Sequence, residues 1–164
     1  MATAHQYFPR CAEVAGQNGF GGIEVVNGSM VGFTGIYLNQ LSEAVEIGLN
    51  TVSAANKVGH QRAEMLNEIL VAQALYVMAD YAGARQHNTK VIEFARQLGS
   101  PRFDAQGLLY EGKLDRAENR PGDAVKTLET ALAMSEKVGH GFSGRVLWAR
   151  SPFASTSRTQ YSVP

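Results

Sequence analysis

Four histidines and one cysteine are the side chains of this 164-residue chain best suited to bind a metal or attack a substrate. His60 and His140 close two copies of the tetrapeptide KVGH, which suggests a shared metal site. The copies are two repeat units apart, however, and neighbouring packed helices already lie about 8–10 Å apart, so the two imidazoles cannot bind one ion. We therefore predict helix-end or turn positions for both. His5 and His87 have no acidic or histidine neighbour at ligand spacing, and we assign them no role.

The single cysteine, Cys11, excludes an internal disulfide and a cysteine-based zinc site. No histidine lies near it in the sequence to activate it, so we predict a small thiol that faces the core. The segment GFGG at 19–22 lacks the lysine and the serine or threonine of a phosphate-binding loop, and an inter-helix turn is predicted instead.

The carboxylates do not form a catalytic pattern. General acid–base chemistry needs paired groups that converge in a pocket. The acidic residues instead fall on helix faces expected to meet water, as at Glu43, Glu46, Asp115 and Glu118. We therefore expect no enzyme activity, no catalytic residue, no metal and no cofactor.

The amino-acid composition limits which classes of function remain for this chain. Hydrophobic residues make up 45% of the chain, enough for one ordinary core. Fifteen basic and fifteen acidic residues cancel, so no overall field attracts nucleic acid or an anionic membrane. The first residues lack the apolar core of a signal peptide, and no window approaches the roughly 18 apolar residues of a membrane span. We expect a cytoplasmic protein that binds neither nucleic acid nor membrane.

The elements that must position any binding site repeat at a 40-residue interval. One series of glycines and one of alanines define the interval: Gly19, Gly59, Gly99 and Gly139; Ala4, Ala44, Ala84 and Ala124. Apolar residues within each unit recur every three or four positions, which is typical of helices, and short breaks make neighbouring helices antiparallel. The expected helices span 3–17, 22–37, 41–58, 61–78, 82–98, 102–117 and 122–138.

The segment 22–37 contains several glycines, each of which costs about 1 kcal/mol of helix propensity. A strand at IEVV, residues 23–26, is the local competitor, although the repeat favours a helix. The glycine series also predicts how helices end, because a left-handed residue commonly closes a helix and glycine adopts that conformation without a clash. Ser100 and Asp80 are predicted N-caps, and Pro101 and Pro121 first-turn residues.

Small residues at fixed spacing identify a known repeat type. The stretch from about 22 to 140 resembles tetratricopeptide repeats through Leu108, Gly112, Ala124, Leu128 and Ala131, and in part through Ala72, Ala84, Gly32 and Ala44. Its unit is longer than that family's roughly 34 residues, and HEAT or armadillo units of about 40–47 residues are the structural alternative. The resemblance implies an all-α fold, a right-handed α-solenoid of antiparallel helix pairs. The expected organisation is a partial repeat at 1–20, repeats at 21–60, 61–100 and 101–140, and an incomplete fourth repeat with a tail at 141–164.

Long-unit arrays of this kind also resemble the C-terminal regions of large bacterial signalling proteins, in which a class III adenylate or guanylate cyclase domain and a signalling ATPase precede the repeats. They are similar to the repeats of maltose-regulon-type transcriptional activators as well. YAGARQH and VIEFARQLGSPRF carry this likeness. The resemblance implies a non-catalytic scaffold that binds a protein or peptide. The alternative is a regulatory fragment that relays a signal to an enzymatic or DNA-binding domain of a parent polypeptide.

In tetratricopeptide stacks the first helix of each pair lines a concave groove. The family's groove positions, carried over one by one, are Val26, Ser29, Phe33, Tyr37, Leu66, Ile69, Gln73, Tyr76, Gln106, Leu109, Lys113 and Arg116. The implied surface is apolar with a basic end. The lysine and asparagine clamp with which chaperone-binding members of the family hold a peptide carboxylate is not evident. The competing interpretation is that about half of these residues belong to the core.

The tail at 141–164 abandons the repeat, because Pro152 interrupts it and the serines and threonines that follow have no apolar period. We expect at most a short helix at 146–150 and disorder after Ser151. Two explanations stay open: a truncated, frame-shifted end of a longer array, or a native terminus.

Overall fold

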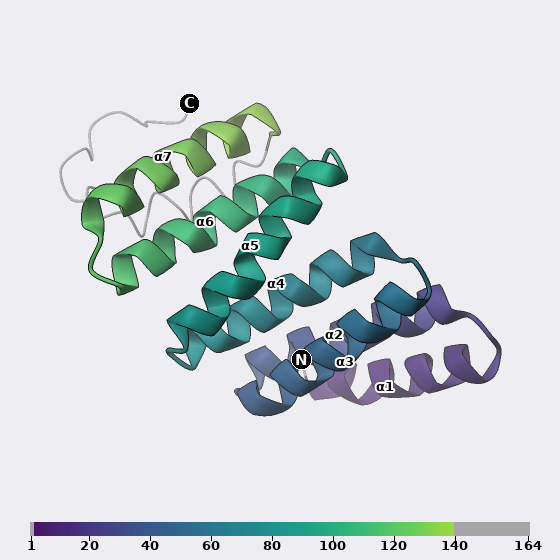
Figure 1. The fold of residues 1–164 in the computed structure, drawn as a ribbon. Helices are drawn as coiled ribbons and strands as arrows, with labels where there is room; N and C mark the ends of the chain where they lie inside the picture. The colour runs from purple at the N-terminus through teal and green to yellow at the C-terminus, as the bar shows by residue number, and fades with distance from the viewer. Residues whose placement is uncertain (1, 140–164) are drawn as a thin grey trace, which may run out of the picture. The chain divides into compact units, whose positions relative to one another are not determined.

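The computed structural model describes residues 2–139, so the predictions for His140 and the tail lie outside the described residues. Helices joined by short turns make up this part of the chain (Figure 1). They are α1 (Ala2–Gln17), α2 (Gly21–Tyr37), α3 (Leu41–Lys57), α4 (Gln61–Val77), α5 (Tyr81–Gln97), α6 (Pro101–Ala117) and α7 (Pro121–Lys137). Every predicted boundary lies within one residue of the observed one. The all-α class is confirmed, and the IEVV segment is helical.

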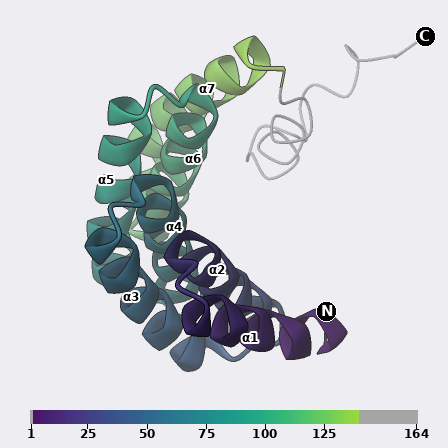
Figure 2. The same ribbon diagram turned by 90° about the vertical axis from the view of Figure 1, so that its right-hand side faces the viewer.

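Helix packing divides the chain into two compact units, Met1–Gly99 and Ser100–Pro164. In the first unit each helix from α1 to α5 packs against the next, and α2 also contacts α4 (Figure 2). Contact with the next helix and with the next but one is the packing of an α-solenoid built from antiparallel helix pairs. In the second unit α6 packs against α7. The division after Gly99 falls at one of the predicted repeat boundaries.

The turns between helices use left-handed residues, as the glycine series predicts. Gly19, Gly59, Gly99 and Gly139 have φ angles of 73°, 67°, 59° and 74°. The turns inside the pairs use the same conformation without glycine, at Asn39, Ala79 and Asn119, with φ angles of 62°, 64° and 60°. Since a side chain resists this conformation, Ala79 is the most strained of the three, having no polar group to bond locally.

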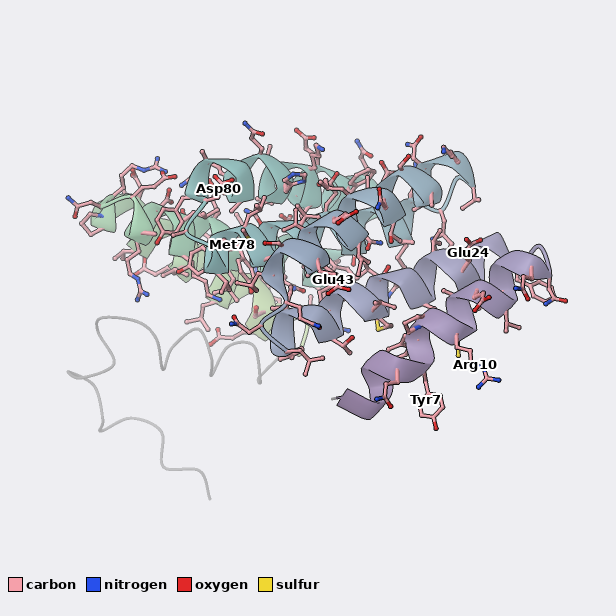
Figure 3. The ribbon with its side chains drawn as sticks, turned by 90° about the horizontal axis from the view of Figure 1, so that it is seen from below. Tyr7, Arg10, Glu24, Glu43, Met78 and Asp80 are labelled. Atoms are coloured by element: carbon pink, nitrogen blue, oxygen red, sulfur yellow. The ribbon has the colours of Figure 1, made fainter. Side chains whose placement is uncertain are left out.

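The four residues predicted to begin helices lie at the predicted positions. Pro101 and Pro121 begin α6 and α7. The side chain of Asp80, labelled in Figure 3, accepts a 2.9 Å hydrogen bond from the backbone nitrogen of Gly83. Ser100 occupies the N-cap position of α6, but its side chain makes no capping hydrogen bond.

Leu70 of α4 lies in the core of the first unit, and it explains one glycine of α2 and the glycine of α3. It is fully buried, and a Cβ added at Gly32 of α2 would collide with it. A Cβ added at Gly48 of α3 would lie 2.6 Å from Leu70 Cδ2 and 2.6 Å from Val71 Cγ2. The helix-breaking residues thus make room for a large side chain, and the burial of that side chain offsets their low propensity.

Candidate functional site

The α2 positions carried over from the repeat family divide into exposed and buried residues. Val26 is 37% exposed, Tyr37 is 72% exposed, and Phe33 is partly exposed. Ser29 is fully buried, and its hydroxyl donates a 2.9 Å hydrogen bond to the carbonyl of Val25. It also accepts a 2.7 Å hydrogen bond from Nδ2 of Asn67. The assignment of Ser29 to a binding surface is therefore wrong, because this residue joins α2 to α4 inside the core.

The α4 positions show the same division. Leu66, Gln73 and Tyr76 are partly exposed, whereas Ile69 is only 3% exposed and belongs to the core. The ring of Tyr76 lies 5.8 Å from that of Tyr81, the first residue of α5, so Tyr76 also supports the turn between the two helices. The resemblance to the repeat family carries Ile69 over to the groove, but a family position does not reveal which face of α4 a neighbouring helix covers in this chain.

The α6 positions lie in the second unit and form a surface of their own. Gln106, Leu109 and Lys113 are partly exposed and Arg116 is exposed. The ammonium of Lys113 lies 4.2 Å from the ring centroid of Tyr110, within cation–π distance. This side of α6 combines an apolar residue with two cations.

A buried carboxylate on α4 joins this helix to α5. Glu68 is 2% exposed, and its two oxygens bond two side chains of α5. Its Oε2 lies 2.5 Å from Nδ1 of His87, and its Oε1 accepts a 3.0 Å hydrogen bond from Nζ of Lys90. Burial by itself raises the pKa of Glu68, but the hydrogen bonds and charges of His87 and Lys90 outweigh it and hold the pKa below its ordinary value.

This carboxylate borders a surface pocket of about 250 Å³ between α3, α4 and α5. The pocket is lined by Val52, Glu64, Glu68, Lys90, Glu93, Phe94 and Gln97. Glu68 is only 2% exposed, whereas Glu93 is exposed and Glu64 is partly exposed, although Nδ2 of Asn56 also bonds Glu64 at 3.4 Å. At 100° per residue, Glu64 and Glu68 lie on the opposite side of α4 from Leu66 and Gln73. The pocket and the predicted groove are therefore separate surfaces.

The histidine and cysteine predictions have mixed outcomes. His60 caps α4, since its Nδ1 accepts a 3.1 Å hydrogen bond from the nitrogen of Ala63, and this confirms the helix-end prediction. His87 has the role described above, which sequence spacing did not suggest. Cys11 is exposed on α1, so the prediction of a core-facing thiol is wrong. Among the described residues, no group of three or more His, Cys, Asp or Glu side chains could hold a metal ion.

Sequence reasoning missed the α4–α5 polar cluster of Glu68, His87 and Lys90. One signal was available, because Glu68 is the one charged residue in the run from Met65 to Ala72, which Asn67 and Glu68 alone keep from being apolar throughout. Its partners lie 19 and 22 residues further along the chain, a spacing that no helical period links. A buried charge in an apolar run needs a partner, but the sequence does not show which one.

Comparison with known proteins adds no identification. No protein-family model matches the chain, and the search of curated proteins finds no relative. Within residues 2–139, no helix is long and apolar enough to cross a membrane. The class defined here is therefore an all-α repeat protein of solenoid type, and its assignment to the tetratricopeptide family stays a prediction from the residue pattern.

Proposed function

We propose that the chain is a non-catalytic scaffold of the tetratricopeptide type that binds a protein or peptide. The observation that carries the proposal is a surface of exposed and partly exposed side chains on two helices in contact, α2 and α4. We call this surface the α2–α4 groove, and its members are Val26, Phe33, Tyr37, Leu66, Gln73 and Tyr76. Buried Ser29, Asn67 and Leu70 hold the two helices together beneath it.

The chemistry of the α2–α4 groove suits an apolar segment of a partner. Tyr37 exposes 72% of its surface to water and Val26 exposes 37%. Covering such side chains is favourable by roughly 25 cal/mol for each Å² of apolar surface removed from water. Gln73 can donate and accept hydrogen bonds to a peptide backbone. The α6 surface with Lys113 and Arg116 is proposed as a second, basic contact region.

A peptide-library selection against the full chain tests this proposal. Selected peptides should bind at least about tenfold more weakly when Tyr37→Ser and Leu66→Ser are combined, because aromatic and apolar anchors dominate most interfaces. Tyr76 is left unchanged, because its ring supports the turn to α5. The matched control is the pair Leu49→Ser and Val58→Ser, which removes a 45% exposed side chain of α3 and the 52% exposed side chain of the residue that follows α3.

Both double variants should keep the far-ultraviolet circular dichroism of the parent. If the selected peptides bind the Tyr37/Leu66 variant as tightly as the parent, or lose affinity equally with the control, the α2–α4 groove is not the binding site. A cytoplasmic location and the alternative role as a relay fragment both stay predictions.

A further inference from the structure

The surface pocket between α3, α4 and α5 combines apolar surface with an excess of negative charge. Val52 of α3 and the ring of Phe94 of α5 are partly exposed in its lining. Among the described residues that line it, one carries an ammonium group, Lys90, and three carry carboxylates: Glu64, Glu68 and Glu93. Lys90 already donates a hydrogen bond to Oε1 of Glu68, so its charge offsets that of the buried carboxylate and leaves the other two uncompensated within the pocket.

Glu68 gives the pocket an acceptor whose position is fixed before any ligand enters. The side chain is 2% exposed and is held by Nδ1 of His87 at 2.5 Å and by Nζ of Lys90 at 3.0 Å. A carboxylate offers about four lone-pair positions, so these two bonds leave it able to accept a further proton donor. A donor that binds there orders no additional protein side chain, which lowers the entropic cost of binding.

The α5 residues of the pocket are not a general feature of the repeat. Glu93, Phe94 and Gln97 have these counterparts 40 residues earlier and 40 residues later: Ser53 and Ala133, Ala54 and Met134, Lys57 and Lys137. Neither neighbouring unit places a carboxylate or an aromatic ring there, and both have a lysine where this unit has a neutral amide. The helix packing common to the units therefore does not require the charge and the ring of this pocket.

The arrangement of the carboxylates favours an organic cation over a metal ion. Three glutamates line the pocket, yet within residues 2–139 no group of three or more His, Cys, Asp or Glu side chains could hold a metal ion, so these oxygens do not converge on one point. A cation whose donors are spread over several atoms can meet separated acceptors. The volume of about 250 Å³ is smaller than the roughly 300–1,000 Å³ of sites for drug-sized molecules, so it suits a single side chain.

We propose that this pocket binds an arginine side chain of a partner protein. A guanidinium group has five N–H donors in a rigid plane, stacks on aromatic rings and is weakly hydrated. Glu64 and Glu93 accept its protons, the ring of Phe94 lies against its plane, and its apolar stem packs on Val52. The ammonium of a lysine is compact and strongly hydrated, so it uses a ring and separated carboxylates less well. The inference does not depend on the α2–α4 groove, which uses other side chains.

Titration of the full chain with N-acetyl-L-arginine amide, followed by proton–nitrogen correlation NMR, tests the proposal. We expect saturable shifts of the backbone amides of α4 and α5 at the pocket, with a dissociation constant on the order of 1 mM, the scale of a ligand of one residue. N-acetyl-L-citrulline amide is the matched neutral probe, because an uncharged urea group of nearly the same shape replaces the guanidinium. It should bind at least about tenfold more weakly, since it lacks charge-assisted hydrogen bonds.

Variants of the chain locate the contact. Glu93→Gln should weaken binding of the arginine probe at least about fivefold, because it removes one of the two uncompensated charges. Glu46→Gln removes the same charge from an exposed residue of α3 outside the pocket, so it is the matched control and should bind like the parent. Phe94→Leu keeps an apolar side chain but removes the ring, and it should reduce the preference for the arginine probe over N-acetyl-L-lysine amide.

Free L-arginine distinguishes a protein ligand from a metabolite. Its carboxylate would lie beside the same glutamates, so it should bind more weakly than the capped probe, and tighter binding would overturn the assignment to a partner protein. Equal binding of the citrulline or lysine probe, equal losses in Glu93→Gln and Glu46→Gln, or the absence of saturable shifts at the pocket would each overturn the proposal. The combined Tyr37→Ser and Leu66→Ser variant should bind the arginine probe like the parent, so failure of the groove and failure of the pocket are separate results.

Discussion

Replacing Glu68 by glutamine should destabilise the first unit more than any other single change of charge in its surface pocket. The glutamine keeps the size of the side chain and one oxygen acceptor but removes the negative charge that His87 and Lys90 contact at 2.5 and 3.0 Å. A hydrogen bond to a buried charged group contributes about 1.5–3 kcal/mol to stability. Lys90 is 51% exposed, so water screens its interaction and it adds less than about 1 kcal/mol. We therefore expect a loss of about 2–3 kcal/mol at neutral pH, carried mostly by the contact with His87.

The same contact makes stability depend on pH in a defined direction. The pKa of Glu68 in the folded chain is below 4.5, its ordinary value. A carboxyl group of this kind stabilises the fold at pH values above its unfolded pKa, and the contribution is lost as the pH falls through the folded pKa. The parent should therefore lose stability below about pH 4.5 more steeply than Glu68→Gln.

Urea unfolding followed by far-ultraviolet circular dichroism measures both effects. Glu93→Gln is the control, because Glu93 lines the same pocket but is exposed, and its change should stay within about 0.5 kcal/mol. The reasoning is refuted if Glu68→Gln unfolds at the same urea concentration as the parent at neutral pH, or if both proteins lose stability equally in acid.

The remaining predictions concern the turns and the core, each measured by thermal or urea unfolding. Gly99→Ala should destabilise the chain by about 1 kcal/mol, since φ is 59° and no atom lies near enough to compensate, and an unchanged melting temperature would contradict the left-handed turn. Ala79→Gly should raise the melting temperature by relieving the same strain, and a lower value would show that Ala79 is not strained. Ser29→Ala should cost about 1–3 kcal/mol because it leaves a buried amide proton of Asn67 without an acceptor; a loss below about 0.5 kcal/mol would contradict that bond. Gly48→Ala should cost about 1–3 kcal/mol through overpacking, and stability equal to the parent would mean that its neighbours move freely.

Helix positions could be predicted to within a residue because their signals are local. A helix and its ends depend on apolar period, on capping side chains and on residues that tolerate positive φ, all within a few positions of one another. Asp80 and Pro101 show this directly, because each acts on the helix that it begins. Ser100 shows the limit of the same reasoning, since its type suits a cap that its side chain does not form.

The candidate site could be predicted only in outline. The resemblance to the repeat family assigned Val26 and Leu66 to a binding surface, and both are at least partly exposed. It placed Ser29 and Ile69 there too, although both are buried. The helical period gives the direction in which a side chain points around the helix axis. It does not show whether a neighbouring helix covers that side.

The amino-acid sequence by itself determined the repeat, the helices and the left-handed glycine turns, because each of these follows from interactions between residues close together along the chain. Only the tertiary structure decided which equivalent positions are covered. Cys11 and Thr51 hold the same place in successive repeats, yet one is exposed and the other is buried. Glu68 finds its partners on the next helix, 19 and 22 residues away. Burial and charge pairing depend on which helices come together in space, and residues of the same repeat position differ whenever their neighbours differ.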